Sequence, residues 1–429
     1  MNIYAWIGLL GIIFFLGLPL LQKSQRTKEN IYKFIKAIVI VFIIIALVVL
    51  MNIPFLFSYL IGLLLFILFD KKTYTKKRLI IYGAIVATLT IVAFVLFKPK
   101  PSHTLNYLTK NPEKTSLYVA HDNDTIITYH SDKPRPLASV VKIIIALEYA
   151  YQIDHGDISK EQMVPLATLN RYYIENTDGG AHEAWINYLE EENKIDTNEV
   201  ALHEVAKGMI TFSSNANTDY LIELLGVENI NDRKSDLELT DHDGVYPLVG
   251  AILISQNFKK EMDNSDWMQQ LKNISDKEYK HLALDYSEQM KNNETKNEFD
   301  LTINEQRIWS DRLPKAPAAT YGKLLHMIAS EQFPEEVSAM MRDLMEWPME
   351  MYEDNKDLYK HFGAKGGSTA FVYNQAIYGE TLDSQPFEIV LFMDDLSIWQ
   401  SIMALIHTDA FIMEIIHNED FLKKVEEEL

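Results

Sequence analysis

One stretch decides the fold of this 429-residue chain: Pro136-Leu137-Ala138-Ser139-Val140-Val141-Lys142-Ile143-Ile144-Ile145-Ala146-Leu147. Apolar residues surround it on every side, which predicts a helix buried in a domain interior. Ser139 and Lys142 are three residues apart and share one helix face, so the lysine amine can reach the serine hydroxyl. A desolvated lysine can take the serine proton and turn the hydroxyl into a nucleophile. The alternative is a buried helix with two polar residues near its start.

Charge separates the chain into two parts. The chain has 40 Lys and Arg against 60 Asp and Glu, but residues 1–100 hold 12 of the basic residues and only two of the acidic ones. The remainder is a strongly acidic soluble domain that would repel phosphates, so we expect no nucleic-acid partner. The chain has no cysteine, which excludes a disulfide framework, a thiol nucleophile and thiolate zinc sites.

The basic first part contains four apolar stretches: Ile3–Leu21, Ala37–Leu50, Phe55–Phe69 and Leu79–Phe97. The first and last approach the roughly 20 residues that cross a bilayer core, and Pro54 favours a break between the middle two. The basic residues fall mainly in two loops, one before and one after the middle pair of stretches. Basic loops stay in the cytoplasm, and only an even number of spans between these two loops places both on that side. The sequence predicts a multi-pass protein of the cell membrane, with its N-terminus and acidic domain extracytoplasmic. An anchor is the simplest role for the spans; lipid, sensor or membrane-protein contacts are the alternative.

The predicted organisation has a four-helix transmembrane region at 1–98, a tether at 99–114, and a folded domain at 115–429 with an insertion at about 256–315. Two strand-forming runs, 116–120 and 125–129, flank an Asp-Asn-Asp turn and predict a hairpin. A capping residue at Thr197 predicts the start of a helix, and further strands are expected after Gly363 and from Pro386. The class is therefore α+β, an antiparallel sheet flanked by helices, after an all-α transmembrane bundle.

Two further motifs follow the Ser139 helix: Ser213-Ser214-Asn215, a polar turn between apolar helices, and Lys365-Gly366-Gly367 in a strand. In this order the three elements resemble those of the penicillin-recognising serine hydrolases, which include class A β-lactamases and D-alanyl-D-alanine peptidases. The resemblance covers roughly residues 115–429. It implies a β-lactamase/transpeptidase-like fold and a serine hydrolase that needs no metal and no cofactor.

The resemblance implies three residues in the chemistry. Ser139 is implied as the nucleophile that forms an acyl-enzyme. Lys142 is implied as the base that takes the proton of this serine. Ser213 is implied as the group that passes a proton to the leaving amine or alcohol.

Four residues are implied in substrate binding. Asn215 would hold the base or an amide of the substrate, and Lys365 would attract a carboxylate or another anionic group. The backbone N–H of Ser368 would join that of the nucleophile in an oxyanion hole. Gly367, in the third motif, is the fourth residue implied in substrate binding.

Two departures from the family pattern narrow the activity. Gly366 stands where the family has Thr or Ser, so binding of a substrate carboxylate is weakened unless Ser368 or Thr369 substitutes. The Glu-x-x-Leu-Asn loop that activates a deacylating water in class A β-lactamases is also absent. Residues 227–250 offer acids outside that pattern: Glu228, Glu238, Asp241 and Asp243. We therefore expect a peptidase, transpeptidase or esterase acting on cell-wall material, a peptide or ester containing D-alanine.

The alternative from another class of function is a non-catalytic protein that binds a β-lactam or a wall fragment as a sensor. β-Lactam receptors resemble this membrane-plus-hydrolase arrangement, but they carry a zinc protease with the motif His-Glu-x-x-His. Here His182-Glu183 and His203-Glu204 both lack the second histidine. Signalling through a zinc protease is thus not expected, and non-catalytic binding stays open.

Overall fold

The computed structural model describes residues 27–49, 62, 98–239, 241–261, 266–292 and 299–429. The chain divides into two units, Met1–Lys98 and Pro99–Leu429. The first unit contains α2 (Lys28–Val49). Charged residues occur up to position 36, so the charge-free part of α2 is 37–49, shorter than the roughly 20 residues that cross a bilayer core.

The described residues include no helix that is both long enough and apolar enough to span a membrane. This contradicts the predicted multi-pass localisation with an extracytoplasmic hydrolase domain. The transmembrane bundle and its contact with the bilayer are likewise unsupported. Three of the four predicted spans, 3–21, 55–69 and 79–97, fall almost entirely outside the described residues.

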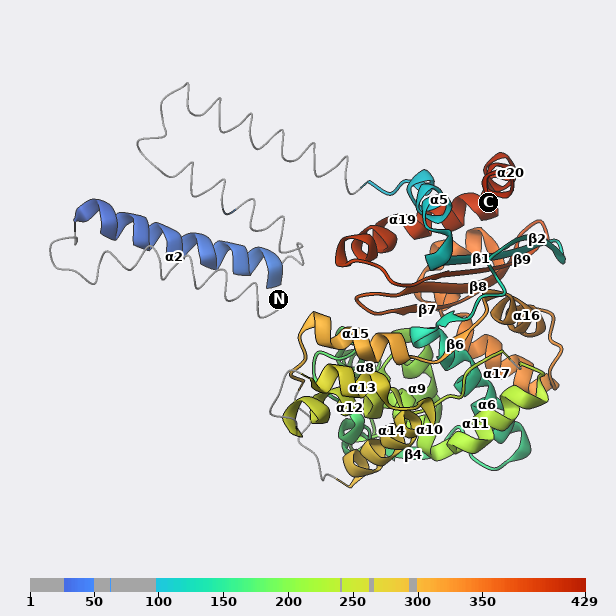
Figure 1. Ribbon diagram of the computed structural model, residues 1–429, viewed down its shortest axis with the longest axis horizontal. Helices are drawn as coiled ribbons and strands as arrows, with labels where there is room; N and C mark the ends of the chain where they lie inside the picture. Colours follow the sequence, from blue (N-terminus) through green and yellow to red (C-terminus); the bar gives the residue numbers. More distant parts are fainter. Residues whose placement is uncertain (1–26, 50–61, 63–97, 240, 262–265, 293–298) are drawn as a thin grey trace. The chain divides into compact units, whose positions relative to one another are not determined.

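The second unit is built on a five-stranded antiparallel sheet of order β2-β1-β9-β8-β7 (Figure 1). Its strands are β1 (Thr115–His121), β2 (Asp124–Tyr129), β7 (Tyr359–Ser368), β8 (Tyr373–Thr381) and β9 (Pro386–Met393). Asp122 and Asn123 join the first two strands, both with positive φ. This is the backbone of a tight two-residue hairpin turn, which favours Asn and Asp. The predicted hairpin and the α+β class with an antiparallel sheet are confirmed.

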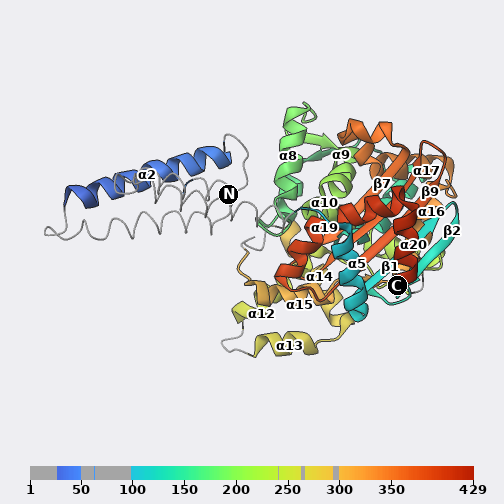
Figure 2. The same ribbon diagram turned by 90° about the horizontal axis from the view of Figure 1, so that it is seen from above.

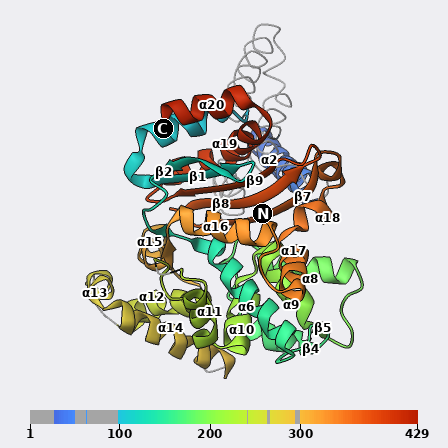
Figure 3. The ribbon, with the colours of Figure 1, turned by 90° about the vertical axis from the view of Figure 1, so that its right-hand side faces the viewer.

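Successive side chains along the strands point to opposite faces of the sheet, and this divides the core into two layers. Leu117 and Val119 of β1 pack into a cluster with the terminal helices, whereas Tyr118 and Ala120 pack into the larger cluster on the opposite face. This is the period of two expected when both faces of a strand are covered. Figure 3 shows the two layers on either side of the sheet.

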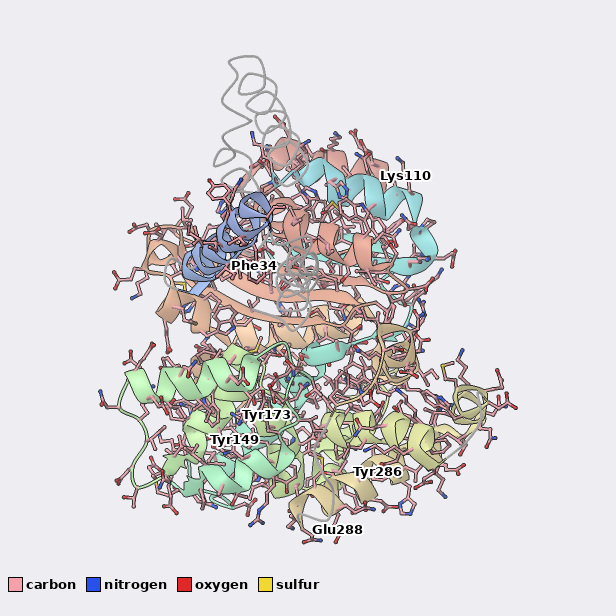
Figure 4. All side chains as sticks on the ribbon, turned by 90° about the vertical axis from the view of Figure 1, so that its left-hand side faces the viewer. Phe34, Lys110, Tyr149, Tyr173, Tyr286 and Glu288 are labelled. Atoms are coloured by element: carbon pink, nitrogen blue, oxygen red, sulfur yellow. The ribbon has the colours of Figure 1, made fainter. Side chains whose placement is uncertain are left out.

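The terminal layer contains α5 (Pro101–Lys110), α19 (Ile398–His417) and α20 (Glu419–Glu428). In Figure 4, Lys110 lies on this side of the sheet, whereas Tyr149, Tyr173 and Tyr286 lie in the helical layers opposite. α16 (Ala318–Ala329) covers the other face, followed by α17 (Glu335–Met345) and α18 (Trp347–Met351).

Most of the remaining described helices form the layers on the α16 side of the sheet, and several of them are labelled in Figure 2, whereas η3 joins α5 to β1 and η7 directly precedes β7. The helices are η3 (Pro112–Lys114), η4 (Ala138–Val141), α6 (Lys142–His155), α7 (Leu166–Leu169), η5 (Asn170–Tyr172), α8 (Ala181–Glu191), α9 (Leu202–Lys207), η6 (Gly208–Phe212), α10 (Asn215–Leu225), α11 (Val227–Asp236), α12 (Leu248–Glu261), α13 (Trp267–Asn273), α14 (Asp276–Lys291), α15 (Ile303–Arg312) and η7 (Glu353–Asp357). Two short ribbons pair β3 (Arg135–Pro136) with β6 (Lys315–Ala316), and β4 (Met163–Pro165) with β5 (Glu199–Ala201).

Candidate active site

Ser139 lies on η4, a single turn of 3₁₀-helix that leads directly into α6. The preceding residue, Ala138, is buried and has φ +46°, a conformation that strains any residue with a side chain. Leu137, Val140 and Val141 are fully buried, so the turn is held by packing and its serine is directed to a cleft. Among the hydrogen bonds of the described residues, none involves the Ser139 hydroxyl.

Lys142 opens α6 and is completely buried. Its Nζ donates to the backbone carbonyl of Ser213 at 2.7 Å and to Oδ1 of Asn215 at 2.8 Å, and it lies 3.2 Å from the Ser213 hydroxyl. The predicted contact is therefore replaced: the amine binds the Ser213 turn and forms no hydrogen bond to Ser139. Burial lowers the pKa of Lys142 well below its usual value, and the charge of Lys365 lowers it further.

Ser213 brings the second and third motifs together. It follows the π-helical turn η6 and has φ +68°, so the chain reverses there before Ser214 caps α10. Its hydroxyl lies 3.0 Å from Nζ of Lys365, which also donates to the carbonyl of Gly366 at 2.9 Å. Burial lowers the pKa of Lys365 to about 7. One serine hydroxyl thus lies between two buried amines.

Gly367 fixes how close strand β7 approaches the Ser139 turn. A Cβ at this position would lie 2.7 Å from both the Leu137 carbonyl oxygen and the Ser139 nitrogen. Only glycine permits this approach. At Gly366 the surroundings are looser, because the nearest atom to a Cβ would be the end of the Gln375 side chain, at 3.2 Å, and the nearest backbone atom, the Asn374 oxygen, would be 3.6 Å away.

Ser368 and Thr369, the two candidates to replace the hydroxyl that is missing at position 366, differ in their surroundings. Ser368 is exposed and lines the cleft. Thr369 also lines it, but its hydroxyl is bonded to that of Ser310 at 2.7 Å and accepts the Phe371 N–H at 3.0 Å. Ser368 is therefore the better placed of the two to meet a ligand.

Three buried polar residues that support the site were not identified from the sequence. Asn374 of β8 donates to the carbonyls of Pro136 and Leu137 and so ties the strand to the segment before Ser139. His182 is hydrogen-bonded to Ser214 at 2.9 Å. A polar residue inside an otherwise apolar strand or helix is the only sequence signal for such positions.

Asp219 is the third of these residues. It is completely buried on α10 and accepts the backbone N–H groups of Leu248, Val249 and Gly250 at the start of α12, at 2.7–3.1 Å. Burial raises the pKa of Asp219 to about 7, although these three N–H groups and Lys142 oppose the rise.

The motifs meet in a cleft of about 850 Å³. All predicted site residues except the buried Lys142 line it: Ser139, Ser213, Asn215, Lys365, Gly367 and Ser368. Within the described residues its carboxylates are Asp178 and Asp409, and Asp178 is engaged by three backbone N–H groups of residues 180–182. None of the four acids considered for water activation lines the cleft. From the same part of the sequence, residues 227–250, the apolar Leu248 lines it instead. No group of His, Asp or Glu in the described parts of the chain is arranged to hold a metal ion.

The sequence profile described as the Beta-lactamase enzyme family matches residues 102–395. The chain belongs to this family. It is a serine hydrolase of the β-lactamase type, as the three motifs predict. No curated protein matches the chain.

Solved structures similar to this β-lactamase family chain have low sequence identity. A class A β-lactamase from Bacteroides cellulosilyticus is 16% identical, over 73% of this chain and 98% of its own, with a TM-score of 0.44. A β-lactamase from Chitinophaga pinensis is 14% identical with the same coverages and TM-score. PBP-A is 13% identical, over 74% of this chain and 98% of its own, also with a TM-score of 0.44.

Proposed function

We propose that this chain transfers the acyl group of a D-alanine-containing cell-wall peptide or ester through an acyl-enzyme on Ser139. The observation that carries the proposal is the buried Lys142 amine. Two acceptors, the Ser213 carbonyl and Asn215 Oδ1, use two of its hydrogens. A neutral amine has only two hydrogens, so its third contact, with the Ser213 hydroxyl at 3.2 Å, is made through the lone pair, and this lone pair can accept a proton.

The first step forms the bond between Ser139 Oγ and the acyl carbon. The hydroxyl proton passes to neutral Lys142, and hydrogen bonds of this kind commonly tighten only when substrate is bound. The negative oxygen that develops on the carbonyl lies between the backbone N–H groups of Ser139 and Ser368, where one donor is worth ~3–4 kcal/mol.

The second step breaks the bond between the acyl carbon and the leaving nitrogen or oxygen. Ser213 donates its proton to that atom and is reprotonated by the proton that Lys142 has taken, because the two groups are 3.2 Å apart. An incoming acceptor then loses a proton to Lys142 and bonds to the acyl carbon. The bond between that carbon and Ser139 Oγ breaks, and Lys142 returns the proton to Oγ, which restores the Ser139 hydroxyl. Lys365 in its cationic form attracts the carboxylate of the substrate.

The surroundings of the cleft favour slow deacylation by water. Among the described residues that line the cleft, only Asp409 has a carboxylate without hydrogen bonds to the backbone. Asp409 lies on α19 with Leu405 and Ile412. A water beside Ser139 therefore lacks the base that class A β-lactamases supply. We therefore expect water to remove the acyl group from Ser139 slowly, so that an added amine or alcohol, which is a better nucleophile, competes with it.

Intact-protein mass spectrometry with benzylpenicillin and with p-nitrophenyl acetate tests the proposal. We expect a single acyl adduct on the wild-type protein, none on Ser139→Ala, and an unchanged adduct on Ser102→Ala, an exposed serine away from the cleft. The adduct should be long-lived in water and shorter-lived with added glycine or D-alanine. Binding of benzylpenicillin without an adduct would overturn the catalytic proposal and favour the non-catalytic alternative.

A further inference from the structure

Helix α15 (Ile303–Arg312) belongs to the segment that is inserted before β6, and it reaches the far end of the cleft. Gln306 and Trp309 line the cleft, and their spacing places both on one helical face; Leu313, directly after the helix, also lines it. Figure 1 shows α15 between the helical layers and the sheet. The inserted segment therefore contributes a wall of the site as well as a separate core.

A second face of α15 is fastened to the loop that follows strand β7. The Ser310 and Thr369 hydroxyls are hydrogen-bonded at 2.7 Å. The Arg307 guanidinium lies 4.8 Å from the centre of the Phe371 ring and forms an ion pair with Asp395. These contacts join the helical half of the unit to the sheet beyond the oxyanion-hole residue Ser368.

The reacting groups determine which part of a substrate meets this wall. Ser213 must face the leaving group to protonate it, and Lys365 lies on the same side, 3.0 Å from the Ser213 hydroxyl. The acyl part must then extend the other way along β7, toward Ser368 and Thr369. Ser368 is three residue steps along the strand from Lys365, about 10 Å, which brings the acyl side chain to α15.

On the basis of the proposed function, we propose that α15 is a specificity wall that admits acyl donors with short side chains and excludes bulky ones. Trp309 is the residue that sets the limit. Its half-buried indole ring lines the cleft, and its N–H is a buried atom without a hydrogen-bond partner in the described part of the chain, so the carbon atoms of the ring form the barrier. Leu248 and Leu313 continue the apolar lining.

The test compares two acyl donors with the same reactive nucleus. 6-Aminopenicillanic acid has no acyl side chain, whereas benzylpenicillin carries a phenylacetyl group. Second-order rates of adduct formation on Ser139 are measured for both by intact-protein mass spectrometry. Trp309→Ala should shift the ratio of the rates toward benzylpenicillin by roughly tenfold, the discrimination that a few buried carbons give.

Three variants accompany this measurement. Trp309→Phe keeps an aromatic wall and loses no hydrogen bond, so it should retain the wild-type ratio. Ser310→Ala removes only the bond to Thr369 and should shift the ratio in the same direction by a smaller factor, which keeps the test decisive if Trp309→Ala does not fold. Trp399→Ala removes an exposed tryptophan of α19 and controls for the loss of a large ring.

The outcomes separate this inference from the proposed function. An unchanged ratio in both Trp309→Ala and Ser310→Ala, with adducts still formed on Ser139, would overturn the specificity wall alone. Absence of any adduct from either compound, in the wild type and in all variants, would overturn the proposed acyl-enzyme and this inference with it.

Discussion

The Ser213 hydroxyl lies 3.0 Å from Nζ of Lys365 and 3.2 Å from Nζ of Lys142. Two positive charges this close in a buried site repel each other, so the lysines lose protons as a coupled pair. The arrangement allows one lysine to be neutral while the other is charged. A base and a cation for an anionic substrate can therefore coexist around one hydroxyl.

This pairing predicts opposite pH limits for charged and neutral substrates. Acylation by either donor should fall in acid, because Lys142 must be neutral to accept the Ser139 proton and its lowered pKa places this loss well below the usual range of lysine. Above about pH 7, Lys365 loses its proton. The rate with benzylpenicillin, which carries a carboxylate, should then fall, whereas the rate with neutral p-nitrophenyl acetate should not.

Second-order acylation rates measured on both sides of pH 7 check this prediction. Lys365→Met should remove the alkaline fall for benzylpenicillin and lower its rate below pH 7. If both donors decline together above pH 7 in the wild type, attraction of the carboxylate by Lys365 is excluded.

Among the elements, β7 and the η4 turn depend on each other through one glycine. The Cβ of alanine at Gly367 would meet backbone atoms of Leu137, Ser139 and Val140 at 2.7–2.9 Å. Backbone cannot move aside as a flexible side chain can, so the strand or the turn must shift. The position of Ser139 is thus set by a residue more than 200 positions later in the sequence.

Gly367→Ala should lower the free energy of unfolding by about 1–3 kcal/mol, the usual cost of overpacking, and should slow acylation because Ser139 is displaced. Gly366→Ala is the matched control, since its nearest contact is the mobile end of Gln375 at 3.2 Å, and its stability should stay within about 0.5 kcal/mol of wild type. Urea denaturation and adduct formation measure both. Equal stability of the two variants would contradict the close approach.

Another element shows where local sequence misleads. Thr197 predicts a helix start, but residues 199–201 form β5 and the helix begins at Leu202. The segment pairs with β4, with Val164 opposite Val200. Pairing with a distant strand outweighs a local capping preference, and the sequence of this segment alone does not contain that partner.

At the scale of the whole unit, Asp219 joins α10 to α12, the helix in which the predicted insertion begins. Its carboxylate accepts all three N–H groups at the start of α12, and α12 packs on α14 so closely that a Cβ at Gly250 would lie 2.3 Å from the Ala283 carbonyl oxygen. The insertion predicted at about 256–315 thus builds on a helix that begins earlier, at Leu248. Its attachment is a buried charged hydrogen-bond cluster.

Asp219→Ala should lower the free energy of unfolding by about 3 kcal/mol or more, because it leaves three buried N–H groups without an acceptor. Asp219→Asn keeps one acceptor oxygen and should cost distinctly less. Urea denaturation gives the stabilities, and hydrogen exchange should show the loss of protection concentrated in α12. A loss below about 1 kcal/mol in Asp219→Ala would contradict this role.

The sequence by itself determined the features that depend on local pattern. The three motifs predict a serine hydrolase of this family, the Asp-Asn-Asp turn predicts the hairpin, and the strand-forming runs predict the antiparallel sheet. The same local reasoning predicted four membrane spans from hydropathy, and the described residues contradict the resulting localisation.

The tertiary structure alone decided which atoms meet. It placed Lys142 on Ser213 and Asn215 rather than on Ser139, brought Lys365 to the same hydroxyl, and set α15 against the end of the cleft. Desolvation of the two lysines and the close approach at Gly367 arise from packing between segments far apart in the chain. Local periodicity carries no information on such distances, which is why the motifs could be identified from the sequence while their contacts could not.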